Sequence, residues 1–168
     1  WSIRRIEHGK LHAVEAHHRD HRRRIAEALI AAGFRCPIST RFRHEIWVKL
    51  LGNISFNPVS ALTRGTLEEM VRQPDTARLI REVMTEAEAV ANRLGIEIPI
   101  SIDQRMAGGE KAGAHKTSML QDLEAGRPME IESIAGATLE LGERLGVPMP
   151  ATRAVYACVK LLDANRGR

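Results

Sequence analysis

The sequence predicts a mainly α-helical protein that begins with a short β/α segment, and three observations support this fold class. Apolar residues recur every three or four positions over most of the chain. Gly95 and Gly146 follow two long amphipathic stretches, where a left-handed residue would end a helix. β-type runs occur near the start, around residues 3–6 and 11–14, where we expect a weak hairpin or two edge strands.

The elements can be assigned in chain order. A basic helix is expected over roughly residues 20–32, ended by Gly33. Further helices are expected near residues 41–56, 66–72, 75–94, 101–112, 117–125, 131–145 and 151–164. Thr66 and Glu69 have the spacing of a capping box at one of these starts. Pro58 is expected to end or kink the helix that precedes it.

Composition limits the class of protein. A chain of 168 residues and 18.7 kDa allows one domain, or one domain with a fragment of another. Hydrophobic residues make up 43% and mean hydropathy is -0.24, which suits a globular core, and no apolar run approaches the ~18 residues of a membrane span. Cys36 and Cys158 show no CxxC spacing and no secretory signal is visible, so we expect a reducing, cytoplasmic setting.

Basic charge is concentrated at one end of the chain. Residues 1–24 hold seven Lys or Arg against three Asp or Glu, which accounts for the whole net charge of +4. His17 and His21 stand four residues apart and could hold a metal, but a solvated basic face is the favoured interpretation, so no metal site is predicted. A nucleic-acid partner is not favoured either, because no aromatic residue interleaves with these arginines.

Three polar side chains recur at four-residue spacing within an apolar segment. On a helix, Lys49, Asn53 and Asn57 would form one row about 12 Å long that drifts ~80° around the axis. Their neighbours include the apolar residues Trp47, Leu50, Leu51, Ile54 and Phe56. An ammonium and two carboxamides in the interior cost several kcal/mol unless they find partners, so the row predicts a cavity or a ligand. A lysine in an apolar cleft would have a lowered pKa, which suits general acid catalysis.

The alternative is a surface stripe in which Lys49 and the asparagines face solvent.

A second polar segment follows at residues 115–132. Thr117 or Ser118 can cap the helix after it, leaving N–H groups and a hydroxyl available to an anion, although capping without any ligand is the simpler interpretation. Glu130 lies between apolar neighbours, either as a helix N-terminal charge or as an acceptor facing a site.

Together these residues resemble the C-terminal domain of ketopantoate reductases (2-dehydropantoate 2-reductases). The resemblance rests on Trp-x-Lys-Leu-x-x-Asn-x-x-x-Asn-Pro from residue 47, Lys-Thr-Ser-Met-Leu-Gln-Asp from residue 116 and Glu-Ile-Glu from residue 130. It implies a multi-helix domain of the 6-phosphogluconate-dehydrogenase-like type over residues 38–168. Residues 1–37 resemble the last part of the family's N-terminal Rossmann domain.

The resemblance also implies an activity and roles for individual residues. The family reduces 2-dehydropantoate to pantoate with NADPH, a step towards pantothenate and coenzyme A. Lys49 matches the general acid, and Asn53 and Asn57 match the asparagines that orient the lysine and the substrate. Ser118 matches the serine that binds the substrate carboxylate, and Glu130 matches the glutamate that hydrogen-bonds the substrate.

Two departures from the family pattern limit these expectations. His115 stands where some members carry asparagine, which puts substrate contact at that position in doubt. No GxGxxG motif occurs, so we expect a separate Rossmann domain to bind NADPH and the 168-residue chain alone not to turn over substrate.

Interaction through helices is the remaining alternative. The apolar stripe of residues 75–94 could serve a homodimer or an interaction module without catalysis, and core packing explains it equally well.

Overall fold

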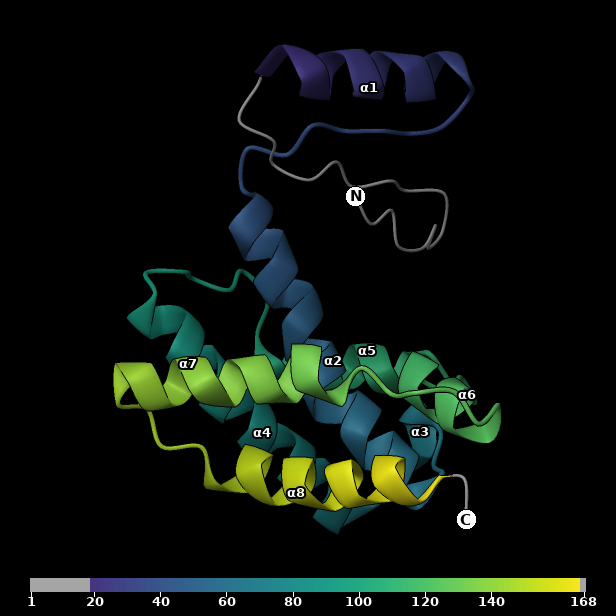
Figure 1. Ribbon diagram of the computed structural model, residues 1–168, viewed down its shortest axis with the longest axis vertical. Helices are drawn as coiled ribbons and strands as arrows, with labels where there is room; N and C mark the ends of the chain where they lie inside the picture. Colours follow the sequence, from purple (N-terminus) through teal and green to yellow (C-terminus); the bar gives the residue numbers. More distant parts are fainter. Residues whose placement is uncertain (1–18, 167–168) are drawn as a thin grey trace. The chain divides into compact units, whose positions relative to one another are not determined.

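The computed structural model describes residues 19–166, and the predicted β-type runs at residues 3–6 and 11–14 lie outside them. The chain divides into two compact units, Trp1–Glu45 and Ile46–Arg168. The elements in order are α1 Arg19–Ala31, α2 Phe42–Thr63, α3 Leu67–Arg72, α4 Pro74–Arg93, α5 Ile102–Lys111, α6 Ser118–Glu124, the π-helix η1 Glu132–Gly136, α7 Ala137–Leu145 and α8 Pro150–Asn165 (Figure 1). The predicted mainly α-helical fold is confirmed.

Local signals at the helix ends have the predicted geometry. The Thr66 hydroxyl accepts the Glu69 N–H while the Glu69 carboxylate accepts the Thr66 N–H at 2.8 Å, which completes the capping box of α3. Gly33, Gly95 and Gly146 have φ of 86°, 71° and 65°, the left-handed conformation in which glycine carries no Cβ penalty. These helix ends therefore follow from a few adjacent residues.

Helix α2 continues past Pro58 to Thr63, so the proline does not end the helix, the first of the two predicted outcomes. Proline lacks the N–H of an ordinary helical residue, at a cost of about 3 kcal/mol in a helix interior. The surrounding turns are buried, since Val59 and Ala61 are each 1% exposed, and Ser60 donates its hydroxyl to the Gly65 carbonyl at 3.0 Å. Burial of the last turns holds the helix to Thr63 against the local preference of proline.

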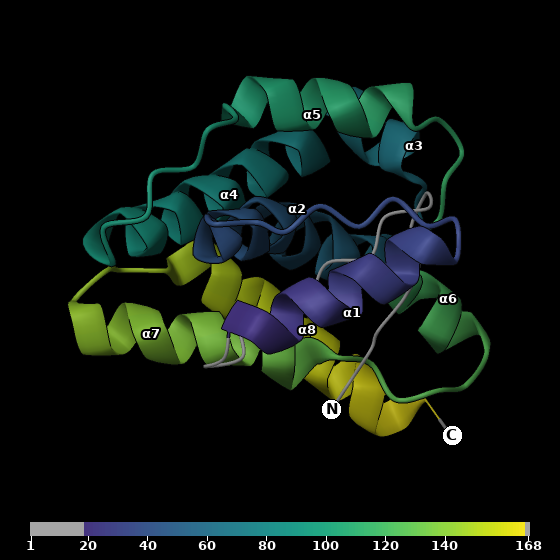
Figure 2. The same ribbon diagram turned by 90° about the horizontal axis from the view of Figure 1, so that it is seen from above.

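The second unit is built around α4. This helix packs against α3, α5, α7 and α8, and Figure 2 shows it running between α5 on one side and α7 and α8 on the other. Its buried stripe consists of Ile80, Val83, Met84, Ala87, Val90 and Ala91. Packing within the unit therefore accounts for the apolar stripe of residues 75–94.

Helix α8 begins on a carboxylate that another helix supplies. Glu86 of α4 accepts the backbone N–H groups of Ala151 and Thr152, both at 2.8 Å, and the Thr152 hydroxyl at 2.6 Å. Pro150, the first residue of the helix, has no N–H to satisfy. One side chain thus satisfies the exposed donors of the first turn and ties α4 to α8.

The predicted 131–145 helix contains a π-helical turn. Glu132 opens η1, and its carboxylate accepts the Tyr156 hydroxyl at 2.8 Å and pairs with Lys160 at 2.9 Å. A Cβ on Gly136 would lie 2.7 Å from Glu132 Oε2, so the Glu132 side chain lies along the turn and over Gly136. The hydrogen bonds from Lys160 and then Tyr156 lower the pKa of Glu132, and those to Tyr156 and Glu132 raise the pKa of Lys160.

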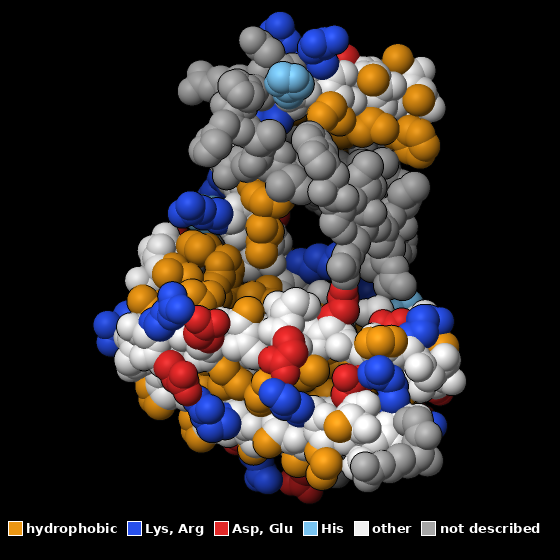
Figure 3. Space-filling view, in the orientation of Figure 1, with side chains coloured by type: hydrophobic (Ala, Val, Ile, Leu, Met, Phe, Trp, Pro, Cys, Tyr) orange, Lys and Arg blue, Asp and Glu red, His pale blue; other side chains and the backbone are white. Residues whose placement is uncertain are grey.

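The described surface carries charges of both signs. On the face of the second unit seen in Figure 3, basic and acidic side chains are interspersed. Arg144 and Glu140 of α7 form one exposed ion pair of the unit. Cys36 is buried and Cys158 is exposed. Among residues 19–166, no helix combines the length and apolar character needed to cross a bilayer.

Candidate functional site

Helix α2 carries Lys49, Asn53 and Asn57 in one row, as the spacing predicts. Exposure falls along the row: Lys49 is exposed, Asn53 is half-buried and Asn57 is only 6% exposed. The expectation that the ammonium lies in the interior is therefore wrong for Lys49 in this chain. The reason is helical rotation, because the ~80° drift carries the row from the solvent side into the core.

The polar side chains of this row have no hydrogen-bond partner in the part of the chain that the structure describes. Among residues 19–166, no side chain or backbone group hydrogen-bonds to the side chains of Lys49, Asn53 or Asn57. The neighbouring hydroxyl is satisfied by contrast, since Ser55 donates to the Leu51 carbonyl at 2.8 Å. The amide atoms of Asn57 are not among the described buried polar atoms that lack a partner, so they still reach the surface and are available there to a polar ligand.

A guanidinium from α5 lies against the same part of α2. Arg105 Nη2 donates to the Val48 carbonyl at 2.8 Å, and a Cβ on Gly52 would lie 2.5 Å from this nitrogen. Burial lowers the pKa of Arg105. The residue was not among the predicted site residues, because nothing in its own segment distinguishes it from a surface arginine. Gly52, a glycine inside an apolar helix, is the signal of close approach that could have found it.

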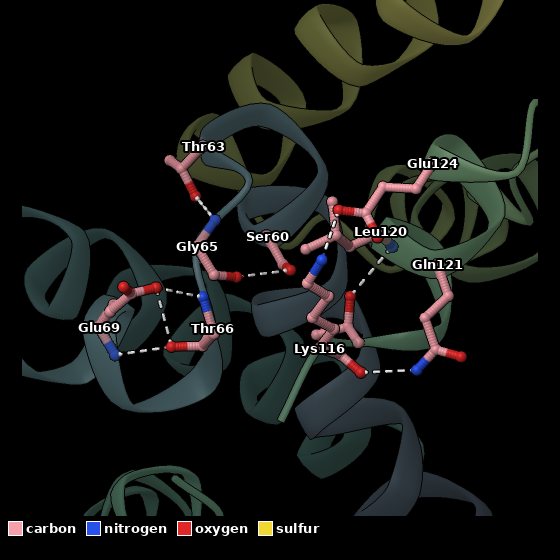
Figure 4. A network of polar contacts seen from close by, with 10 residues as sticks. Ser60, Thr63, Gly65, Thr66, Glu69, Lys116, Leu120, Gln121 and Glu124 are labelled. Carbon is pink, nitrogen blue, oxygen red and sulfur yellow. Dashed lines mark hydrogen bonds and ion pairs between the residues drawn. The ribbon is translucent and has the colours of Figure 1, made fainter. Parts of the chain in front are cut away.

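Ser118 is the first residue of α6 and is half-buried. Thr117 rather than Ser118 is the cap, because its hydroxyl accepts the Leu120 N–H at 3.2 Å. Lys116 pairs with Glu124 at 2.7 Å, and Gln121 donates to the Lys116 carbonyl at 2.9 Å (Figure 4). The cap and these contacts hold the start of α6 and leave the Ser118 hydroxyl available.

The segment before α6 is attached to the start of α3. The Leu67 N–H donates to the His115 carbonyl at 3.1 Å, and the Glu68 N–H donates to the Gly113 carbonyl at 3.2 Å. Because the turn from α2 into α3 is short, these bonds link the Ser118 segment to the Asn57 end of α2 through the chain. Figure 4 shows Ser60 of α2, the turn at Gly65 and the start of α6 in one view.

Glu130 lies in the segment between α6 and η1, and its side chain is exposed between the buried residues Met129 and Ile131. Asp163 of α8 accepts the Met129 N–H at 3.1 Å, and the Glu130 carbonyl accepts the Ile134 N–H at 3.2 Å. These bonds define the backbone on both sides of Glu130. The structure thus places three site residues on one helix and two on separate segments, and the convergence of all five stays a prediction.

The described part of the chain contains no cluster of side chains that could bind a metal ion. Within residues 19–166, no group of three or more His, Cys, Asp or Glu side chains gathers closely enough to hold an ion. His21 lies on α1, while His17 falls outside the described residues.

Comparison with known proteins places these features in a family. Residues 41–163 match the family model described as the ketopantoate reductase PanE/ApbA C terminal. A 2-dehydropantoate 2-reductase of Mesorhizobium japonicum is 48% identical over 143 residues, covering 85% of this chain and 44% of that protein. One from Archaeoglobus fulgidus is 33% identical over 141 residues, covering 84% and 48%.

Solved structures agree with the sequence relatives. A 2-dehydropantoate 2-reductase from Methylococcus capsulatus matches with a TM-score of 0.80 and 32% identity, covering 89% of this chain and 48% of that one. A PanE/ApbA family ketopantoate reductase from Ralstonia eutropha matches with a TM-score of 0.81 and 29% identity, covering 87% and 49%. The chain spans about half the length of the curated relatives it matches. The chain belongs to the ketopantoate reductase family, and residues 41–163 correspond to its C-terminal domain.

Proposed function

We propose that this chain supplies the substrate-binding and proton-donating half of an NADPH-dependent 2-dehydropantoate 2-reductase. The observation that carries the proposal is the polar row of Lys49, Asn53 and Asn57 on α2, which has no partner within residues 19–166 and falls inside the family match. Its cation and carboxamides are complementary to a small molecule with a ketone and a carboxylate. The domain boundary after residue 37 is part of this proposal.

NADPH supplies the hydride in this scheme, from a Rossmann domain that precedes residues 38–168. The described residues contain no glycine-rich turn between a strand and a helix that could hold a dinucleotide, so this chain is not assigned the cofactor site.

The residues of the chain perform the proton transfer. Lys49 donates a proton from its ammonium to the ketone oxygen as the carbonyl carbon becomes a secondary alcohol carbon, and solvent then reprotonates the neutral amine. A cation beside this oxygen stabilises the developing negative charge more than it stabilises the neutral ketone. Exposure of Lys49 in this chain gives the amine access to solvent for reprotonation.

The other four residues bind and orient the substrate in this proposal. Asn53 and Asn57 orient the lysine and the substrate, the Ser118 hydroxyl donates to the carboxylate, and Glu130 accepts a hydrogen bond from substrate. A buried carboxamide that meets a partner only when substrate is bound adds selectivity, because an analogue without that group leaves it unsatisfied.

A steady-state assay of the complete protein in which this chain occurs tests the proposal. NADPH and ketopantoate are the substrates, with other branched 2-oxo acids compared by kcat/KM. We expect Lys49→Ala to lower kcat by ~10²–10⁴-fold, the usual contribution of a positioned general acid. Lys111→Ala is the matched control, because Lys111 is an exposed lysine at the end of α5. An unchanged kcat in Lys49→Ala would remove Lys49 as the acid.

Non-catalytic alternatives are not favoured. The family match and the 48% identical relative both concern reductases, and the apolar stripe of α4 is accounted for by the core. A homodimer stays a prediction, which the mass of the purified protein in solution would test.

A further inference from the structure

We propose that Arg105 is a positioning residue that holds the turn of α2 from which Lys49 projects. The inference rests on the proposed function, since it assigns Arg105 a part in the same proton transfer. It starts from the contact of the Arg105 guanidinium with the Val48 carbonyl at 2.8 Å, because Val48 directly precedes Lys49.

The contact is formed with a helix backbone rather than with a carboxylate. A carbonyl oxygen has two lone pairs, so the Val48 carbonyl can accept the guanidinium in addition to its helical bond. Some other described arginines pair with acids at the surface, as Arg81 does with Asp103 and Arg127 with Asp122. Among residues 19–166 no acid pairs with Arg105. A half-buried guanidinium without an acidic partner costs free energy, so we infer that Arg105 does more than add positive charge to the surface.

Gly52 makes the contact possible. Val48 and Gly52 are one turn apart on the same face of α2, and a Cβ at residue 52 would lie 2.5 Å from Arg105 Nη2 and 3.3 Å from its Cζ. The first distance is too short for non-bonded atoms, so alanine would displace the guanidinium. Each of these two residues precedes a member of the polar row, Lys49 or Asn53, which lies about 100° further around the helix.

Positioning matters here because Lys49 itself has no anchor. Its side chain is exposed and has no bonded partner within residues 19–166, so the direction of its ammonium depends on the backbone turn that carries it. Proton transfer requires the donor within hydrogen-bond reach of the ketone oxygen, and displacements near 1 Å lower rates greatly. The hydrogen bond from Arg105 to the Val48 carbonyl limits the motion of the helical turn that carries Lys49.

Kinetics of the complete protein separate positioning from structural support and from substrate binding. We expect Arg105→Met to lower kcat on the order of tenfold or more with KM for ketopantoate changed less than about threefold. Arg105→Lys should restore part of kcat, since one donor remains, and Gly52→Ala should reproduce the loss while Arg105 is retained. Arg81→Met removes the exposed ion pair that joins α4 to Asp103 of α5. It is the control and should leave kcat within about twofold.

Three results would overturn the inference. One is a kcat within about twofold of wild type in folded Arg105→Met, including the case where only the melting temperature falls. A second is a raised KM with unchanged kcat, which would make Arg105 a substrate-binding residue instead. The third concerns amide hydrogen exchange at residues 48–53, which we expect to be faster in Arg105→Met than in wild type and unchanged in Arg81→Met. Unchanged exchange in Arg105→Met would overturn the inference. Hydrogen exchange needs no enzymatic activity, so it tests whether Arg105 restrains α2 even if the wild-type protein does not reduce ketopantoate. A wild-type protein without that activity would refute the proposed function alone.

Discussion

Helices α6 and α8 begin in different ways, although both support the candidate site. Thr117, the residue directly before α6, caps that helix with its own hydroxyl. Helix α8 has no side-chain cap of its own and relies on Glu86, 65 residues earlier in the chain. A local cap stabilises one helix, whereas a borrowed carboxylate stabilises a helix and the packing of two helices at once. Mutations of the two caps should therefore differ in how much they lower the free energy of unfolding and in how many helices they affect.

The largest effect is expected at the borrowed cap. Glu86→Ala leaves the N–H groups of Ala151 and Thr152 without their acceptor, and we expect it to lower the free energy of unfolding by about 2 kcal/mol. The stability of Glu86→Gln should lie between that of wild type and that of Glu86→Ala, because the amide oxygen still accepts a hydrogen bond but carries no charge. Urea denaturation measures the change. Glu82→Ala, an exposed carboxylate one turn earlier on α4, is the control, and an equal loss in both variants would contradict the role of the cap.

A smaller effect is expected at the local cap. Thr117→Ala removes the acceptor for the Leu120 N–H and should lower the free energy of unfolding by about 1 kcal/mol. Thr117→Ser keeps the hydroxyl and should recover most of this loss. Hydrogen exchange should show faster opening limited to the first turn of α6. If opening spreads to α8, the contrast between local and borrowed caps is wrong.

The smallest effect concerns pH and the capping box of α3. The hydrogen bond from the Thr66 backbone, followed by the one from its hydroxyl, lowers the pKa of Glu69 below its ordinary value. A depressed folded-state pKa stabilises the protein above the unfolded-state pKa, and this contribution is lost as pH falls through the folded value.

Glu69→Gln removes this titration while glutamine can still complete the capping box. We therefore expect the melting temperature of the variant to fall less than that of wild type between about pH 7 and about pH 3. Equal falls in both proteins would show that the Glu69 carboxylate does not couple the α3 cap to pH.

Prediction from sequence succeeded where adjacent residues carry the information. The Thr66 capping box and the left-handed Gly95 and Gly146 each depend on three or four neighbouring residues, and the row of Lys49, Asn53 and Asn57 depends only on helical spacing. It did not foresee that α2 continues past Pro58, where burial of the last turns outweighs the helix-ending preference of proline. It also missed the π-turn Glu132–Gly136, whose first residue binds Tyr156 and Lys160 of α8.

The order of elements, the helix ends and the family motifs were determined by the sequence itself, because short-range sterics, capping hydrogen bonds and 3.6-residue periodicity act within a few residues. Only the tertiary structure decided that Glu86 caps α8, that Arg105 reaches the Val48 carbonyl and that the polar row runs from solvent at Lys49 into the core at Asn57. The first two features join residues that lie 65 and 57 positions apart in the chain, and the third depends on which helices cover α2, so a short stretch of sequence specifies none of them.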